Sequence, residues 1–185
     1  RFDDGNDNQK VDKTKKAKKS NLDKYIQLYE AEAFKQKFDY PATVSISLTG
    51  FGNYEVHYKD KKTNPNVRMN GGDENYLAVN GFSIENGRNL TPLDVQSGRN
   101  VCMIGSDVAT KLFGLYKDNA VDKFINVGGT PYRVIAVLKS KGSSALLRAD
   151  NVIITSYKNV WRTGFGGNSF TIVVLAGDIT QVDGA

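Results

Sequence analysis

The stretch NYLAVNGFSIENGRNLTPLD, residues 75–94, has the residue types that come nearest to those of a binding site. It contains the pairs Asn80-Gly81 and Asn86-Gly87, and Arg88 lies six positions before Asp94. Asn and Gly both tolerate positive φ, so the two pairs are strong turn signals. An arginine and an aspartate at this spacing can form an ion pair that closes the intervening loop. We therefore interpret the stretch as turns fastened by a structural Arg88–Asp94 pair.

Other residues that could carry chemistry have weaker support. The glycine-rich run RTGFGGNSF, residues 162–170, lacks the lysine that would reach a phosphate and precedes a strand-like run. His57 is the single histidine, so no second imidazole completes a metal or catalytic site. The carboxylate pairs Asp3-Asp4 and Asp73-Glu74 lie in polar stretches, where water keeps both members ionised. G-x-S-x-G, H-E-x-x-H and phosphate-loop motifs are absent. The sequence predicts a non-catalytic protein without metal or cofactor.

Cys102 is the only cysteine, which excludes an intrachain disulfide and a cysteine-based zinc cluster. It lies in the apolar run NVCMIG, where a free cysteine behaves as a small hydrophobic residue. We predict that it is buried. A single thiol is compatible with an oxidising compartment such as a periplasm, because it has no partner within the chain.

The net charge of +5 is concentrated in one segment. Between Lys10 and Lys24 seven lysines face only Asp12 and Asp23, and the remaining charges balance. Such a segment can contact an anionic partner, or it can be a solvated charge run near a chain end. Nucleic acid is not expected as the partner, since aromatic residues do not alternate with these lysines. The residues proposed to meet an anionic surface are Lys13, Lys15, Lys16, Lys18 and Lys19.

The composition, 39% hydrophobic and 24% charged, is typical of a soluble globular domain. The longest apolar runs, VIAVL and IVVLA, are far shorter than the ~20 residues of a membrane helix. The chain begins with Arg1 instead of Met, which predicts a processed or excised piece. Residues 1–19 hold almost no apolar side chains and predict a mobile basic arm, with the folded domain at 20–185.

Two helices are expected from capping signals and apolar spacing. Ser20 and Asp23 resemble a capping box, and an apolar stripe continues to about residue 37, before Pro41. The run SDVATKLFG predicts a second helix with a cap at Ser106 or Asp107. The stripe of the first helix would comprise Leu22, Tyr25, Ile26, Tyr29 and Ala33, and the buried face of the second Val108, Ala109, Leu112 and Phe113.

Period-two patterns predict more strand than helix. Val44, Ile46 and Leu48 alternate with polar residues, and the run NYEVHYK places His57 opposite its apolar face. A hairpin is expected around Gly128-Gly129. Two further strands are expected at 151–157 and 170–176. Together, the expected helices and strands predict an α+β fold, with too few helices for a doubly wound sheet.

The ordered runs YLAVNGFSIENGRNLTPLD, NVCMIGSDVATKLFG, AVDKFINVGGTPYRVIAVL and NVIITSY resemble the MacB-like periplasmic core domain over residues 75–157. The chain departs from the family at Asp122, where members usually have glycine, and at Ala120, where many have proline. The first difference predicts a turn of another shape. The residues that carry the resemblance are Gly87, Arg88, Asp94, Gly105, Leu112, Phe113, Gly114, Lys123 and Ile125.

The resemblance implies a domain inserted between the first and second membrane helices of an ABC transporter permease, at the periplasmic face of the bacterial inner membrane. It implies two lobes of mixed or antiparallel sheet with a few short helices, one lobe built from both chain ends and the other from about residues 80–150. Such a domain would act as a lever, with ATP hydrolysed by a separate cytoplasmic ATPase. The implied partners are a periplasmic adaptor, or a lipoprotein or peptide substrate.

The resemblance further implies a dimeric permease, and it leaves the oligomeric state of this domain alone open. It also places Lys10–Lys24 near the membrane, where lysines can meet anionic headgroups. Two alternatives follow from the residues. A free secreted or periplasmic module could hold an anionic polymer through the basic segment, with salt-sensitive binding that is lost without residues 1–19. A hydrolase would need a pocket with two or more carboxylates of raised pKa.

Overall fold

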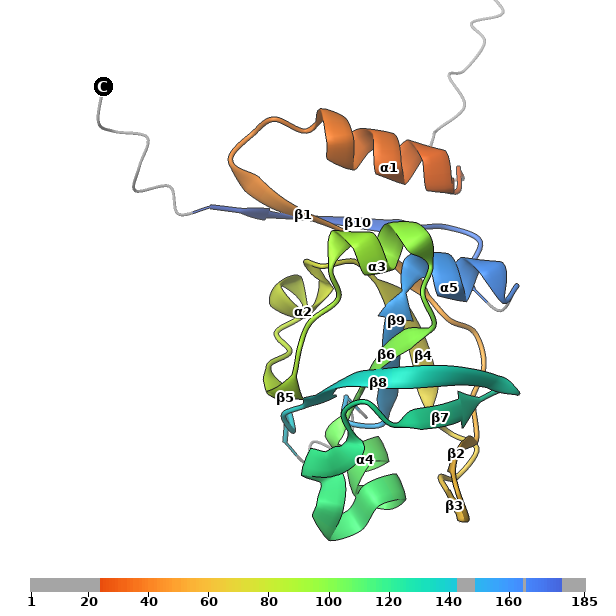
Figure 1. Cartoon of the computed structure of the whole chain (residues 1–185). Coiled ribbons are helices and arrows are strands. Elements are labelled where there is room, and N and C mark those ends of the chain that lie inside the picture. The colour runs from red at the N-terminus through yellow and green to blue at the C-terminus, as the bar shows by residue number, and fades with distance from the viewer. Residues whose placement is uncertain (1–23, 143–148, 165, 178–185) are drawn as a thin grey trace, which may run out of the picture.

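The computed structural model describes residues 24–142, 149–164 and 166–177 (Figure 1). The predicted basic arm, with its five candidate lysines, and the predicted capping box at Ser20 and Asp23 lie outside the described residues. In the described part the fold is α+β, as predicted: one large mixed sheet with a few short helices.

Strands from distant parts of the chain are neighbours in the sheet. Parallel pairing joins β4 to β9 and β6 to β8, and the other pairs are antiparallel. A further strand, β5 (Ile84–Gly87), pairs with β8 outside the main order. That order is β10 (Thr171–Ala176), β1 (Ala42–Thr49), β4 (Arg68–Gly72), β9 (Val152–Ser156), β6 (Val101–Ile104), β8 (Thr130–Leu138), β7 (Phe124–Val127), β2 (Val56–Tyr58) and β3 (Lys61–Lys62).

The described helices are short, and they sit at the two ends and along the side of the sheet (Figure 1). None of them has the length and apolar character needed to cross a bilayer. They are α1 (Leu28–Lys37), α2 (Tyr76–Val79), α3 (Pro92–Ser97), α4 (Ser106–Phe113) and α5 (Tyr157–Arg162), with a 3₁₀ segment, η2, at Gly114–Ala120.

The core lies at the central strands. Every residue of β6 and β9 is buried, because both faces of these strands are covered. Cys102 is fully buried on β6, and this burial raises the pKa of its thiol. The prediction of a small buried hydrophobic residue is therefore confirmed.

The predicted strands are confirmed. On β1, Val44, Ile46 and Leu48 are buried, and the hairpin of β7 and β8 turns at Gly128-Gly129. His57 is exposed on β2 opposite the buried Val56, and its Nε2 lies 2.8 Å from a carboxylate oxygen of Glu55. The two expected strands at 151–157 and 170–176 correspond to β9 and β10.

The predicted helix over 20–37 is wrong in its start and its stripe. Gln27 is the N-cap, and its backbone N–H donates to Glu30. Ile26 lies before the helix because its N–H donates to Ser169 Oγ and its carbonyl accepts from Phe170, at 3.0 Å each. These bonds to a distant segment use the backbone groups that a helical turn would need. Within α1 only Ala31 is buried.

Two local predictions need correction. Gly105, not Ser106 or Asp107, is the N-cap of α4, and the N–H of Asp107 instead donates to the carbonyl of Asp150. The pair Asn86-Gly87 is part of β5, and Gly87 keeps a positive φ of 94° inside the strand. Tertiary contacts decide both cases. The bond to Asp150 occupies the N–H of Asp107, and the pairing of β5 with β8 keeps Asn86-Gly87 in a strand.

Asp122 stands where the family resemblance leads us to expect glycine. It has a φ of 70°, the left-handed conformation that glycine favours. Its carboxylate lies 2.5 Å from Arg133 on β8. A turn whose shape differs from that of the family stays a prediction.

The order of the described strands runs from β10 and β1, beside which α1 lies, to β7, β2 and β3 at the other end (Figure 1). The pairing of β1 with β10 joins the early and late parts of the chain, with Ala42 opposite Ala176. The division into two lobes, with one lobe at about 80–150, stays a prediction.

Candidate functional site

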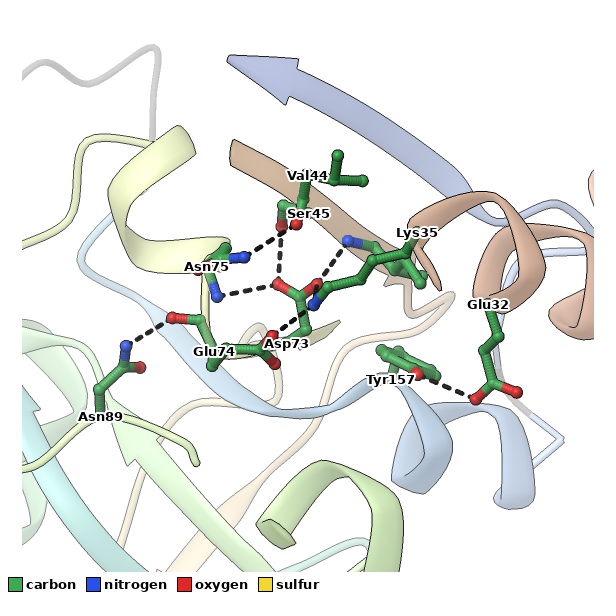
Figure 2. Close-up of polar contacts among 10 residues, drawn as sticks. Glu32, Lys35, Val44, Ser45, Asp73, Glu74, Asn75, Asn89 and Tyr157 are labelled. Carbon is green, nitrogen blue, oxygen red and sulfur yellow. Dashed lines mark hydrogen bonds and ion pairs between the residues drawn. The ribbon is translucent and has the colours of Figure 1, made fainter. Parts of the chain in front are cut away.

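A buried carboxylate lies where α1 meets the sheet. Asp73 directly follows β4, and its side chain is almost fully buried (Figure 2). One carboxylate oxygen accepts hydrogen bonds from Lys35 Nζ at 2.8 Å and from the N–H of Ile46 at 2.7 Å. The other accepts from Ser45 Oγ at 2.8 Å and from the N–H of Asn75 at 3.0 Å. Both oxygens are therefore fully engaged by donors from three separate segments.

Lys35 brings the charge of α1 into this cluster. Its ammonium group lies 2.8 Å from Asp73 and 2.5 Å from Glu74. Partial burial by itself would lower the pKa of Lys35, but the hydrogen bonds and negative charges of the two carboxylates outweigh it and raise the pKa. Lys35 therefore remains protonated and holds α1 to the turn between β4 and α2.

A second polar contact ties α1 to α5. Tyr157 donates its hydroxyl to Glu32 at 3.0 Å, and Lys158 lies 3.5 Å from the same carboxylate. Burial, and then the hydrogen bond and charge of Glu32, raise the pKa of Tyr157. Since α1 buries so few apolar side chains, these contacts and those of Lys35 are its main attachments.

A cavity of about 400 Å³ opens between these attachments, bordered by α1, α3 and α5. Its charged lining consists of Glu32, Lys35, Glu74 and Lys158. Each carboxylate in it is already paired with one of the two lysines. The arrangement holds helices together and leaves no carboxylate there without a cation.

The cluster continues toward α3 through one asparagine. Asn89 donates from its side-chain amide to the carbonyl of Glu74 at 2.7 Å (Figure 2). Its side-chain oxygen accepts from the N–H of Leu90 at 2.8 Å. The loop that precedes α3 is therefore joined to the same turn that Lys35 holds from the other side.

The predicted Arg88–Asp94 pair is present. Arg88 lies 2.7 Å from Asp94, whose side chain is almost completely buried while that of Arg88 is half exposed. Asp94 also accepts from the N–H of Thr91, and Thr91 Oγ1 accepts from the N–H of Asp94, which completes a capping box for α3. Burial would raise the pKa of Asp94, but the bonds from Arg88 and Thr91 and the guanidinium charge lower it.

The lowered pKa of Asp94 predicts that its contribution to the free energy of unfolding is lost in acid. A carboxyl with a lowered folded pKa stabilises the fold above its unfolded value, about 3.9, and loses that contribution as the pH falls through the folded pKa. We expect Asp94→Asn to lower the free energy of unfolding by about 1.5 kcal/mol at pH 7. Urea unfolding of both proteins between about pH 7 and 2 should show the difference shrinking in acid. A constant difference would contradict this role.

Most residues that carry the family resemblance lie where they support the fold. Gly87 and Gly105 lie where a side chain would meet the backbone of β8 and of Asp150. Ile125 and Leu112 are buried, and Gly114 ends α4. The ring of Phe113 packs in a tilted orientation against that of Tyr58, with 4.4 Å between ring centroids. Leu112, Phe113 and Lys123 also border a cavity of about 600 Å³ near β3. Their role as family residues stays an expectation.

The sequence pattern missed Asp73, which was expected to be solvated. Gly71 and Gly72 precede it, and a Cβ at either would come within 2.6 Å of Tyr157 or Tyr76. The two glycines let the end of β4 approach α5 and α2 closely, and the next residue is thereby enclosed. A Gly-Gly pair at the end of a strand, followed by a carboxylate, is the signal that could have indicated it.

Comparison with known proteins identifies a matching family and several relatives of this chain. The model of the family described as the MacB-like periplasmic core domain matches residues 4–185. The uncharacterized ABC transporter permease YknZ of Bacillus subtilis is 30% identical over 121 residues, which are 65% of this chain and 29% of that protein. The pyoverdine export ATP-binding/permease protein PvdT of Pseudomonas aeruginosa is 28% identical over 134 residues, 71% of this chain and 19% of that protein. The chain thus spans less than a third of each relative.

Two solved structures share the fold. The periplasmic region of MacB from Actinobacillus actinomycetemcomitans superposes with a TM-score of 0.68 at 20% identity, covering 88% of this chain and 71% of that one. The extracellular domain of the transporter YknZ from Gram-positive bacteria gives 0.62 at 23% identity, covering 85% and 76%.

Proposed function

Because the chain belongs to the family of MacB-like periplasmic core domains of ABC transporter permeases, we propose that it transmits ATP-driven movement of the membrane helices to the export or release of a substrate. The domain itself is non-catalytic in this proposal, and a cytoplasmic ATPase supplies the energy. In this proposal the intact permease is a dimer in the inner membrane, and this domain lies at its periplasmic face. The proposed partner is a periplasmic adaptor, or a lipoprotein or peptide substrate.

The arrangement of the two ends of the described chain supports this proposal. The segment before α1 bonds to Ser169 and Phe170, next to β10. β10 in turn pairs along its whole length with β1. A movement that enters through either end would therefore reach the same layer, formed by α1, β1 and β10 (Figure 1).

The observation that carries the proposal is the polar path from α1 into the rest of the domain. Lys35 binds Asp73 and Glu74, and the Glu74 carbonyl binds Asn89 in the loop before α3. Since few apolar contacts fix α1, a displacement of this helix acts on the body mainly through these charged and hydrogen-bonded groups.

The test measures this coupling in the intact permease with its ATPase, in nanodiscs. Spin labels at Gln36→Cys on α1 and Lys111→Cys on α4 report one distance across the domain. Both positions are exposed, whereas the native Cys102 is buried and remains unlabelled. We expect the distance distribution to shift when ATP binds, and Lys35→Met to reduce that shift severalfold.

The matched control is Arg133→Met, which removes the cation of an exposed pair with Asp122 far from α1. It should leave the ATP-dependent shift unchanged. A distance that does not respond to ATP in the unmodified permease would overturn the proposal. An equal shift in the Lys35→Met protein would overturn the path through Asp73.

A further inference from the structure

Three exposed aromatic side chains surround the glycine-rich loop that follows α5. Tyr25, Phe51 and Trp161 are 61%, 63% and 56% exposed, and we call them the aromatic surface. Tyr25 and Trp161 line one open cavity of about 410 Å³. Phe51 adjoins it, because a Cβ at Gly167, another lining residue, would lie 3.7 Å from its ring. Large exposed aromatic groups gathered at one place are characteristic of an interaction surface.

These side chains stand on a fixed support. Ile26, next to Tyr25, bonds through its backbone to Phe170 at 3.0 Å. Gly50, next to Phe51, pairs with Gly166 in an isolated bridge. The N–H of Gly167 donates to the carbonyl of Thr49 at 2.8 Å. Because the backbone is held in this way, the rings stay outside the core while the segments that carry them remain part of the fold.

The lining of the cavity contains no charged residue in a chain that is 24% charged. The three segments that carry the aromatic surface, 24–29, 49–54 and 157–170, hold no aspartate or glutamate. Their charged residues are Lys24, Lys158 and Arg162, and Lys158 already pairs with Glu32. Lys24 and Arg162 are the cations of these segments that have no carboxylate partner among the described residues, and their charge complements an anionic surface.

The place of Tyr25 in the sequence also favours an anionic partner. Tyr25 follows Lys24 directly, and the segment Lys10–Lys24 accounts for the whole net charge of the chain. Tryptophan and tyrosine favour the boundary between bilayer and water, because each combines an apolar body with a polar group. Basic residues beside them add attraction to anionic lipids. An apolar contact flanked by lysine and arginine is the pattern of a surface-bound membrane contact.

We propose that the aromatic surface of Tyr25, Phe51 and Trp161 seats against the anionic headgroup region of the bilayer. The inference rests on the proposed function, which anchors the chain in that membrane. Contact there would fix the start of α1 relative to the bilayer and leave Lys35, toward the other end of the helix, to act on Asp73.

Trp161 is the only tryptophan, so its fluorescence reports on this surface alone. The 185-residue chain is mixed with vesicles of phosphatidylcholine, and with vesicles that also contain about one third phosphatidylglycerol. With the anionic vesicles we expect a blue shift of the emission and quenching by brominated acyl chains. Both effects should weaken at high salt, because screening reduces the attraction of the basic border.

The variant Tyr25→Ser/Phe51→Ser keeps the reporter and should lower the partition coefficient about tenfold. The control Leu115→Ser/Tyr116→Ser removes two exposed apolar side chains in η2 and should leave it unchanged. An emission spectrum of Trp161 that stays unchanged with both kinds of vesicle would overturn the inference. Vesicle binding without any change in Trp161 emission would do the same. A blue shift with soluble glycans or peptides, and none with vesicles, would assign the surface to another partner. None of these outcomes touches the ATP-dependent distance that tests the proposed function.

Discussion

Asp73→Ala is expected to lower the free energy of unfolding by about 4 kcal/mol, a large fraction of the stability of a domain of this size. The change removes all four hydrogen bonds of the carboxylate. It leaves the hydroxyl of Ser45 and the N–H groups of Ile46 and Asn75 without their acceptor in a buried place. It also leaves Lys35 with Glu74 as its remaining carboxylate partner.

Urea unfolding measures this effect, and a double-mutant cycle with Lys35→Met separates the ion pair from the other bonds. The coupling energy between Lys35 and Asp73 should exceed about 1 kcal/mol, since the Lys35 side chain is only 24% exposed. The control is Asp122→Asn, which breaks the exposed pair with Arg133, keeps a side chain that tolerates the φ of 70°, and should cost less than about 1 kcal/mol. Equal losses for the two aspartates would refute the role assigned to Asp73.

Gly87→Ala is expected to destabilise the domain by about 4 kcal/mol, for two reasons that act together. The residue has a φ of 94°, which strains any side chain. A Cβ there would also lie 2.1 Å from the carbonyl oxygen of Ile135 on β8, so the two strands would have to separate. The N–H of Arg88 bonds to that same carbonyl, and the separation would weaken the bond.

Gly129→Ala is the matched control, because it tests the strain without the clash. Gly129 has a φ of 86°, and a Cβ there would meet no atom within 4 Å. Gly129→Ala should lower the free energy of unfolding by about 1 kcal/mol, the ordinary cost of alanine at positive φ. Thermal or urea unfolding of both variants measures the two losses. The loss for Gly87→Ala minus that for Gly129→Ala is the contribution of the close contact with β8. Similar losses would mean that β5 adjusts freely against β8.

The sequence alone determined the elements whose pattern is local. Alternation of Val44, Ile46 and Leu48 predicted β1, and Gly128-Gly129 predicted the hairpin of β7 and β8. The spacing of Arg88 and Asp94 predicted their ion pair correctly, because both residues belong to one capped loop of seven residues. The ordered motifs over 75–157 predicted the family, and the family model confirms it over nearly the whole chain.

Only the tertiary structure decided where α1 begins and what holds it. Ile26 has the spacing of a helical residue, yet its backbone bonds to Ser169 and Phe170, which are distant in sequence. Asp73 has the surroundings of a solvated loop residue in the sequence, yet α1, β1 and its own turn enclose it. Burial of a charged group depends on which segments meet around it, and nearest neighbours along the chain do not carry that information.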